Sequence, residues 1–98
     1  MQWATVLYPN KVGARFDFGY YMEKHIPMVE GLLNTKIEVR KGIAAPGSPR
    51  VPFVCTASIR INSVEEFSAA MAKHGQQVLG DIPNYTDIQP IVQIDEAM

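Results

Sequence analysis

The chain has 98 residues, of which 47% are hydrophobic, a composition that suits one small globular domain over residues 1–98. Nine basic and ten acidic side chains give a net charge of −1 and form no cluster of either sign, so the basic footprint that nucleic acids need is absent. No apolar run approaches the roughly 18 residues of a membrane span. The single cysteine, Cys55, cannot form an internal disulfide. We therefore expect a cytoplasmic protein without nucleic-acid or membrane partners.

The first third of the chain predicts a strand followed by a broken helix. Residues 3–8 are β-branched and aromatic, which is typical of a strand. Apolar side chains then recur at helical spacing, at Phe18, Tyr21, Met22, His25, Val29, Leu32 and Leu33. Pro27 interrupts this pattern because it has no N–H to donate and disfavours a helical backbone at Ile26. We therefore expect two short helical pieces, over 17–25 and 27–33.

The middle of the chain predicts a pair of strands. Residues 35–44 and 53–61 alternate between apolar and polar side chains, the pattern of a strand with one buried face. A segment with three prolines, 45–52, separates them and predicts a hairpin-like loop. On the second strand Cys55 falls on the apolar face, which favours an inert buried thiol over a nucleophile.

A second helix and a last strand complete the predicted order. Ser63 and Glu66 have the spacing of a capping box, in which each side chain bonds the other's backbone N–H. The helix that follows should end near Gly80, and Gly75 inside it predicts an irregularity. After a turn at 81–84, residues 85–94 predict a strand.

This β-α-β-β-α-β order predicts an α+β, ferredoxin-like domain. Such a domain has a four-stranded antiparallel sheet with both helices on one face. Its other face would lie open and carry small side chains such as Val54, Thr56 and Ser58. The small size of the chain and this open face predict a homodimer closed sheet to sheet.

Two parts of the sequence resemble the EthD family. The matching stretches are Leu7-Tyr8-Pro9, Arg15-Phe16-Asp17, Tyr20-Tyr21, His25-Ile26-Pro27, Gly80-Asp81-Ile82-Pro83-Asn84-Tyr85-Thr86 and Gln93-Ile94. The family is named for an accessory role in bacterial ether degradation. The resemblance implies a dimeric α/β barrel, a superfamily that includes isomerases, cyclases and cofactor-free monooxygenases, with pockets between sheet and helices.

His25 is the candidate catalytic residue. It lies one helical turn from Tyr21 and from Val29, so its side chain should point toward the sheet. One interpretation is a general acid or base, because histidine titrates near neutral pH. The other is a structural histidine that bonds a carbonyl left free by Pro27. The helix C-terminus would favour its charged form and burial would oppose it, so the direction of its pKa shift stays open.

Four further residues are candidates for substrate binding. Tyr8 and Tyr21 would hold an oxygen of the substrate by hydrogen bonding, or simply pack at the sheet. His74 lies on the apolar stripe of the second helix, where packing is the alternative. Asp81 would orient or charge a histidine, or else bond the backbone of its own turn.

The sequence predicts no cofactor and no metal. No histidine or glutamate spacing places two metal ligands on one helix face, and no glycine-rich loop precedes a helix. Three functions stay open. The first is a cofactor-independent enzyme that moves a proton in a small hydrophobic oxygenated compound, by isomerisation, cyclisation or dehydration. The second is a non-catalytic binding protein of a degradation pathway. The third, by analogy with the superfamily, is a cofactor-free oxidoreductase.

Overall fold

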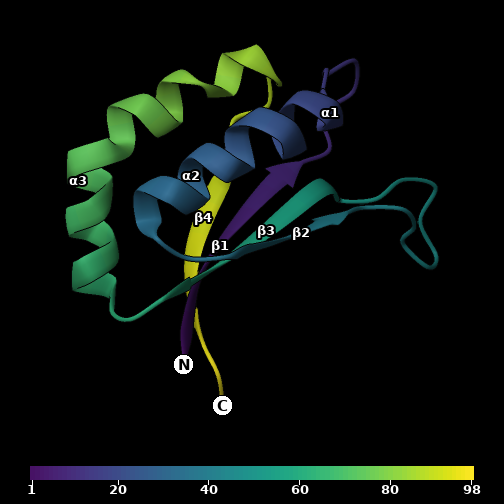
Figure 1. Ribbon diagram of the computed structural model, residues 1–98. Coiled ribbons are helices and arrows are strands. Elements are labelled where there is room, and N and C mark those ends of the chain that lie inside the picture. The colour runs from purple at the N-terminus through teal and green to yellow at the C-terminus, as the bar shows by residue number, and fades with distance from the viewer.

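Alternating apolar side chains build a four-stranded antiparallel sheet in the order β2-β3-β1-β4. In the computed structural model, which describes residues 1–98, the strands are β1 (Gln2–Pro9), β2 (Ile37–Lys41), β3 (Phe53–Ile61) and β4 (Ile91–Glu96). All helices lie on one side of this sheet, as Figure 1 shows. The predicted ferredoxin-like α+β fold and its element order are confirmed.

The two central strands, β1 and β3, supply the face of the sheet that packs against the helices. Their register places Ala4 opposite Ile59 and Tyr8 opposite Cys55. These side chains face the helices and are buried. Burial raises the pKa of the Cys55 thiol to about 11, which agrees with an inert cysteine.

The first helix contains a π-turn at the predicted break. It runs through α1 (Phe18–Tyr20), the π-helical segment η1 (Tyr21–His25) and α2 (Ile26–Leu33) without leaving the helical region. The N–H of Ile26 donates to the carbonyl of Tyr21, five residues earlier. The hydrogen bonding is therefore displaced where the proline predicted it.

The expected non-helical backbone at Ile26 is wrong. Ile26 has φ −61° and ψ −47°, an ordinary helical conformation. Pro27 cannot donate to Glu23, and its ring crowds that carbonyl. One wider turn of helix accommodates the ring, so the chain does not separate into two pieces.

The second helix, α3 (Val64–Gly80), begins as predicted and is regular throughout. The Glu66 N–H donates to Ser63 Oγ at 3.0 Å, but the Glu66 carboxylate accepts from Asn62 Nδ2 instead of the Ser63 N–H. Only half of the predicted capping box forms. The predicted irregularity at Gly75 is also wrong, because α3 continues through this buried glycine.

Two predicted strands are shorter in the structure. The second strand covers Ile37–Lys41 instead of 35–44, and the last begins at Ile91 instead of residue 85. Pro90 cannot donate a ladder hydrogen bond, so pairing starts only after it. Before it, a short 3₁₀ turn, η2 (Ile82–Asn84), leads into a segment whose Tyr85 is completely buried. Tyr85 therefore lies in the core beside the helices and not in the sheet.

None of the helices combines the length and apolar character needed to cross a membrane.

We predict that Ser63→Ala lowers the free energy of unfolding by about 1 kcal/mol, because the first turn of α3 loses its N-cap acceptor. Ser68 is exposed in the same helix and makes a matched control, so Ser68→Ala should leave stability nearly unchanged. Urea unfolding of both variants is the measurement. Equal stability of the two would contradict a capping role for Ser63.

Candidate functional site

His25 lies at the end of the π-turn and faces the sheet, with only 4% of its surface exposed. Both ring nitrogens have side-chain partners. Nδ1 lies 2.8 Å from Asp81 Oδ2, and Nε2 lies 3.3 Å from the Tyr85 hydroxyl. The structural interpretation, in which His25 bonds a free carbonyl near Pro27, does not describe this geometry. His25 instead connects the first helix to the corner that follows α3.

Asp81 is held by donors from two directions. Its Oδ1 accepts from the Tyr20 hydroxyl at 2.6 Å and from Asn84 Nδ2 at 2.9 Å, while Oδ2 faces His25. Its side chain accepts no backbone N–H of η2, so the predicted bond to the backbone of its own turn does not form. Burial would raise the pKa of Asp81, but the hydrogen bonds from Tyr20, Asn84 and His25 outweigh it and lower the pKa. Asp81 is therefore ionised at neutral pH.

The environment of His25 favours the neutral imidazole. Burial is the largest influence on the pKa of His25 and lowers it, and the hydrogen bond and charge of Asp81 offset this only in part. An ionised carboxylate accepts only, so Nδ1 must carry the ring proton. Nε2 is then left as a lone-pair acceptor. The direction of the shift, which the sequence left open, is downward.

Tyr85 and Tyr8 extend the His25–Asp81 pair into a series of hydrogen bonds that all run in one direction. Nε2 has no proton, so the Tyr85 hydroxyl must donate to it. The Tyr8 hydroxyl lies 2.8 Å from that of Tyr85 and donates in turn. Burial raises the pKa of Tyr8, Tyr21 and Tyr85, so all three phenols keep their protons. The Tyr21 ring stacks on His25, with ring centroids 5.5 Å apart, and fixes the plane of the imidazole.

An apolar cavity of about 80 Å³ lies against this chain of hydrogen bonds. Its walls come from the sheet, from α2 and from α3, and include Val29, Ala57, Phe67 and Met71. Tyr8, Tyr21 and His25 are the lining residues whose side chains carry N or O atoms. Only His25 among the lining residues titrates near neutral pH. The cavity is therefore lined by one proton-exchanging side chain and two tyrosines among apolar residues.

The structure brings together four of the five predicted site residues. His25, Tyr8 and Tyr21 line the cavity, and Asp81 bonds His25 from behind. The fifth, His74, is half-buried on α3, does not line the cavity and forms no hydrogen bond with the others. The structure gathers no group of three or more His, Cys, Asp or Glu side chains that could hold a metal ion.

Sequence reasoning missed three contributors, Tyr20, Asn84 and Tyr85. Tyr20 lies off the apolar stripe of the first helix, and Tyr85 was assigned to a strand. The pattern that could have found two of them is the spacing after Asp81. Asn84 and Tyr85 follow it by three and four residues, so one tight turn brings them to the same side.

The fold and site define a ferredoxin-like α+β domain with a buried His–Asp pair beside an apolar cavity. No family model matches the chain, and no curated protein matches it. Among solved structures, an EthD-like protein from Ralstonia eutropha JMP134 is 44% identical, with a TM-score of 0.89 over 97% of this chain and 89% of that one. An EthD family protein from Bacillus halodurans C-125, 16% identical with a TM-score of 0.69, shares the fold over 100% of this chain and 99% of its own. The chain belongs to the EthD family.

We predict that burial holds the pKa of His25 below the usual range for histidine and that the neutral imidazole carries its proton on Nδ1. Nitrogen-15 NMR of the imidazole reports both properties, and His74→Gln leaves His25 as the only signal. Asp81→Asn should change the ratio of the two tautomers, because an amide no longer imposes a proton on Nδ1. A protonated Nε2 in the unaltered chain at neutral pH would contradict this assignment.

The same shift predicts how stability depends on pH. Below about pH 6.5 the unfolded chain takes up a proton that the folded His25 resists, so the free energy of unfolding falls as the pH drops toward the folded pKa. His25→Gln should remove this contribution. Urea unfolding at about pH 7 and about pH 5.5, on either side of the histidine titration, measures the difference. An equal loss in both proteins would exclude His25 as its source.

Proposed function

We propose that this protein is a cofactor-independent enzyme that moves a proton within a small hydrophobic compound bearing a carbonyl or hydroxyl oxygen. His25 is its acid and base. The observation that carries the proposal is a neutral imidazole, oriented by an ionised aspartate, on the wall of an otherwise apolar cavity. A perturbed titratable group in such a place is typical of catalytic sites.

The proposed step needs no co-reactant. A C–H bond next to the substrate carbonyl breaks, its proton joins His25 Nε2, and the electron pair moves to the carbonyl oxygen. The hydroxyls of Tyr8 and Tyr21 stabilise that oxygen by hydrogen bonding. Asp81 stabilises the imidazolium. In a substrate with a C=C bond next to that α-carbon, the electron pair returns from the oxygen, the double bond shifts by one position, and the imidazolium gives the proton to the far carbon of the original double bond. Substrate and product are isomers, so atoms and electrons balance.

The Tyr85 hydroxyl must leave Nε2 for this step to occur. Its 3.3 Å separation from Nε2 is long for an O–H donor, so the bond is weak. The Tyr8 hydroxyl, 2.8 Å from the Tyr85 oxygen, can then accept from Tyr85 instead of donating to it, which frees the Tyr8 O–H for the substrate oxygen. Tyr85 thus covers Nε2 in the empty site and can yield it to a substrate.

A second candidate is a non-catalytic binding protein that uses the same cavity. The occupied Nε2 favours it, because both imidazole nitrogens and every buried side-chain N or O atom already have hydrogen-bond partners. A site that is complete without a ligand has no need to exchange protons. Turnover by the unaltered protein separates the two functions.

We predict that the protein accelerates the exchange of α-hydrogens of small ketones in D₂O. Butanone and cyclohexanone are suitable probes, and proton NMR follows the loss of the α-hydrogen signal. His25→Gln should slow the exchange by about 100-fold or more while the ketones still bind, since general acid–base catalysis contributes that much. The same change at His74 tests the binding role that the sequence predicts for that residue. Binding without exchange in the unaltered protein would leave the non-catalytic function.

The setting follows from the family and the cysteine. We place the reaction in a catabolic pathway, as the name of the family implies. The single buried thiol suits a reducing compartment, so we place the protein in the cytoplasm.

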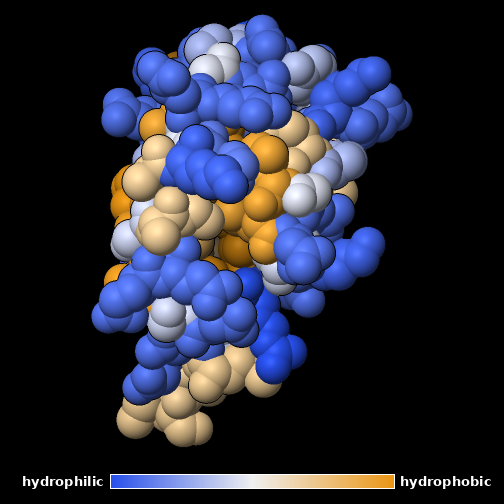
Figure 2. All heavy atoms as spheres, turned by 60° about the vertical axis from the view of Figure 1, so that its left-hand side comes forward, coloured by the Kyte–Doolittle hydropathy of each residue, from blue (hydrophilic) through white to orange (hydrophobic).

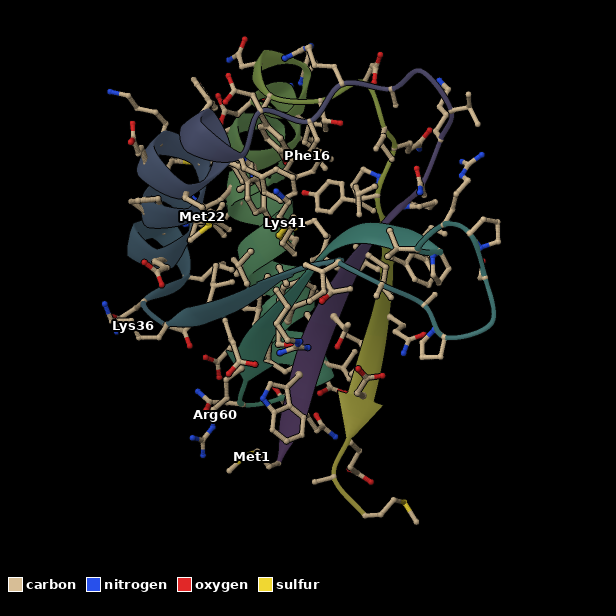
Figure 3. All side chains as sticks on the ribbon, turned by 90° about the vertical axis from the view of Figure 1, so that its right-hand side faces the viewer. Met1, Phe16, Met22, Lys36, Lys41 and Arg60 are labelled. Atoms are coloured by element: carbon tan, nitrogen blue, oxygen red, sulfur yellow. The ribbon has the colours of Figure 1, made fainter.

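We also propose that two copies associate through the uncovered face of the sheet. Figure 3 views this face, on which side chains stand with no helix over them. It forms a broad hollow of about 640 Å³ with Trp3, Thr5 and Ser58 among its lining residues. Its charges are of both signs, with Arg40 and Glu38 paired, so two copies in opposite orientation can complement each other.

We predict a dimer of twice the 10.9 kDa chain mass in sedimentation at micromolar protein. Ser58→Glu should dissociate it, because the new carboxylate would be desolvated beside Glu38 in a closed interface. Ser68→Glu, on the exposed side of α3, makes the matched control. A monomer in the unaltered protein would exclude the association.

A further inference from the structure

The cavity is too small to hold a substrate of ordinary size. Its volume of about 80 Å³ is about half that of a cavity of roughly 150 Å³ that holds one benzene molecule. Only the reacting end of a molecule fits beside His25. The remainder must leave the cavity, and the structure shows where it would go.

The cavity shares four lining residues with a shallow surface groove of about 520 Å³. These are Leu79 at the end of α3, Ile82 of η2, Pro90 directly before β4, and Val92 within β4. Leu79 is 59% exposed and Val92 51%, so the boundary between the cavity and the groove consists of surface side chains. Figure 2 shows apolar side chains gathered in a hollow on the face that α3 borders. The groove therefore lies next to the cavity, with these four side chains between them.

Arg15 lies on the groove with its guanidinium already positioned. Its two terminal nitrogens donate to the carbonyls of Pro83, at 2.7 Å, and Asn84, at 3.5 Å. No carboxylate pairs with the guanidinium. Carbonyl partners fix its position and leave its full charge and several N–H groups for another acceptor.

The one acidic residue on the groove makes no ion pair with the Arg15 guanidinium. Asp87 Oδ1 accepts the backbone N–H of Arg15 at 2.9 Å, so it serves the main chain of the loop. The other groove residues are apolar or uncharged. A ligand carboxylate would thus meet one fixed cation, at the end of an apolar path that leads to His25.

We propose that the substrate is a small carboxylate: its oxygenated, reactive end enters the cavity, its hydrocarbon part lies in the groove, and its carboxylate binds Arg15. This inference rests on the proposed function and narrows its substrate class. Arg15 is a specificity residue that does not touch the reacting atoms. A planar carboxylate matches the geometry of a guanidinium and forms strong charge-assisted hydrogen bonds with it.

Binding of octanoate and octanol, followed by NMR shifts and titration calorimetry, tests the proposal. Both probes have the same hydrocarbon chain, and only octanoate has a charge for Arg15. We expect octanoate to bind about tenfold or more tightly than octanol. Shifts at His25 and Val92 should show that both probes occupy the cavity and the groove.

The variants assign the difference to Arg15. Arg15→Gln should remove the preference for octanoate and leave octanol binding unchanged, while Arg15→Lys should keep part of it. Arg50 is exposed in the loop between β2 and β3, so Arg50→Gln is the matched control for net charge and should keep the full preference. Thermal unfolding of Arg15→Gln shows whether loss of the hydrogen bonds to Pro83 and Asn84 destabilises the fold. If it does, Arg15→Lys still tests the proposal, because lysine keeps the positive charge.

The outcomes separate this inference from the proposed function. Equal binding of octanoate and octanol, or a preference that survives in Arg15→Gln, would overturn the role of Arg15 and leave the cavity's function standing. If neither probe shifts the His25 signals, this inference fails, while the exchange of butanone α-hydrogens still decides the proposed function.

Discussion

The hydrogen bond between His25 and Asp81 is the interaction on which the site depends. The two residues are 56 positions apart, one in the first helix and one directly after the second. Their 2.8 Å contact joins the two helices at one end and sets the tautomer of the imidazole. Every other polar contact of the site either fixes Asp81 or follows from the proton that it places on Nδ1.

The apolar surroundings of this hydrogen bond make every side chain of the cluster around it necessary. A polar group in an apolar interior costs free energy unless it is paired, and here every buried side-chain N or O atom has a partner. Tyr20 and Asn84 hold one oxygen of Asp81, and His25 takes the other. Removal of one donor would leave a buried acceptor without a hydrogen-bond partner. The cluster therefore behaves as a unit and holds its geometry closely.

The sequence predicted the fold and placed Tyr8, Tyr21 and His25 on facing sides of the sheet and the first helix, since both follow from local patterns. Periodicity places Tyr21 and His25 on the inner side of the first helix, and strand alternation places Tyr8 on the same side of the sheet. The EthD resemblance at the Asp81 turn supplied the remaining partner. These features are set by residues close together in sequence, so one chain suffices to recognise them.

The misses came from tertiary structure overriding local preference. Pro27 disfavours a helical Ile26 in isolation, but packing keeps the helix whole and a π-turn absorbs the ring. Tyr85 has high strand propensity, yet Pro90 delays the strand and the tyrosine fills the space between Tyr8 and His25. Tyr20 lies off the apolar stripe and gains its role only because Asp81 approaches from the other helix.

The apolar cavity and the aspartate act on His25 in opposite directions, and this balance suits proton transfer. Burial lowers the pKa of His25, so the base is unprotonated and ready at neutral pH. The same burial would penalise the imidazolium formed when a proton arrives. Asp81 offsets that penalty, and its own low pKa shows that its donors keep it charged. Because those donors are already in place, no group must reorganise when charge develops on His25. The apolar space thus keeps the base neutral before the reaction, and the fixed negative charge of Asp81 stabilises the imidazolium that forms during it.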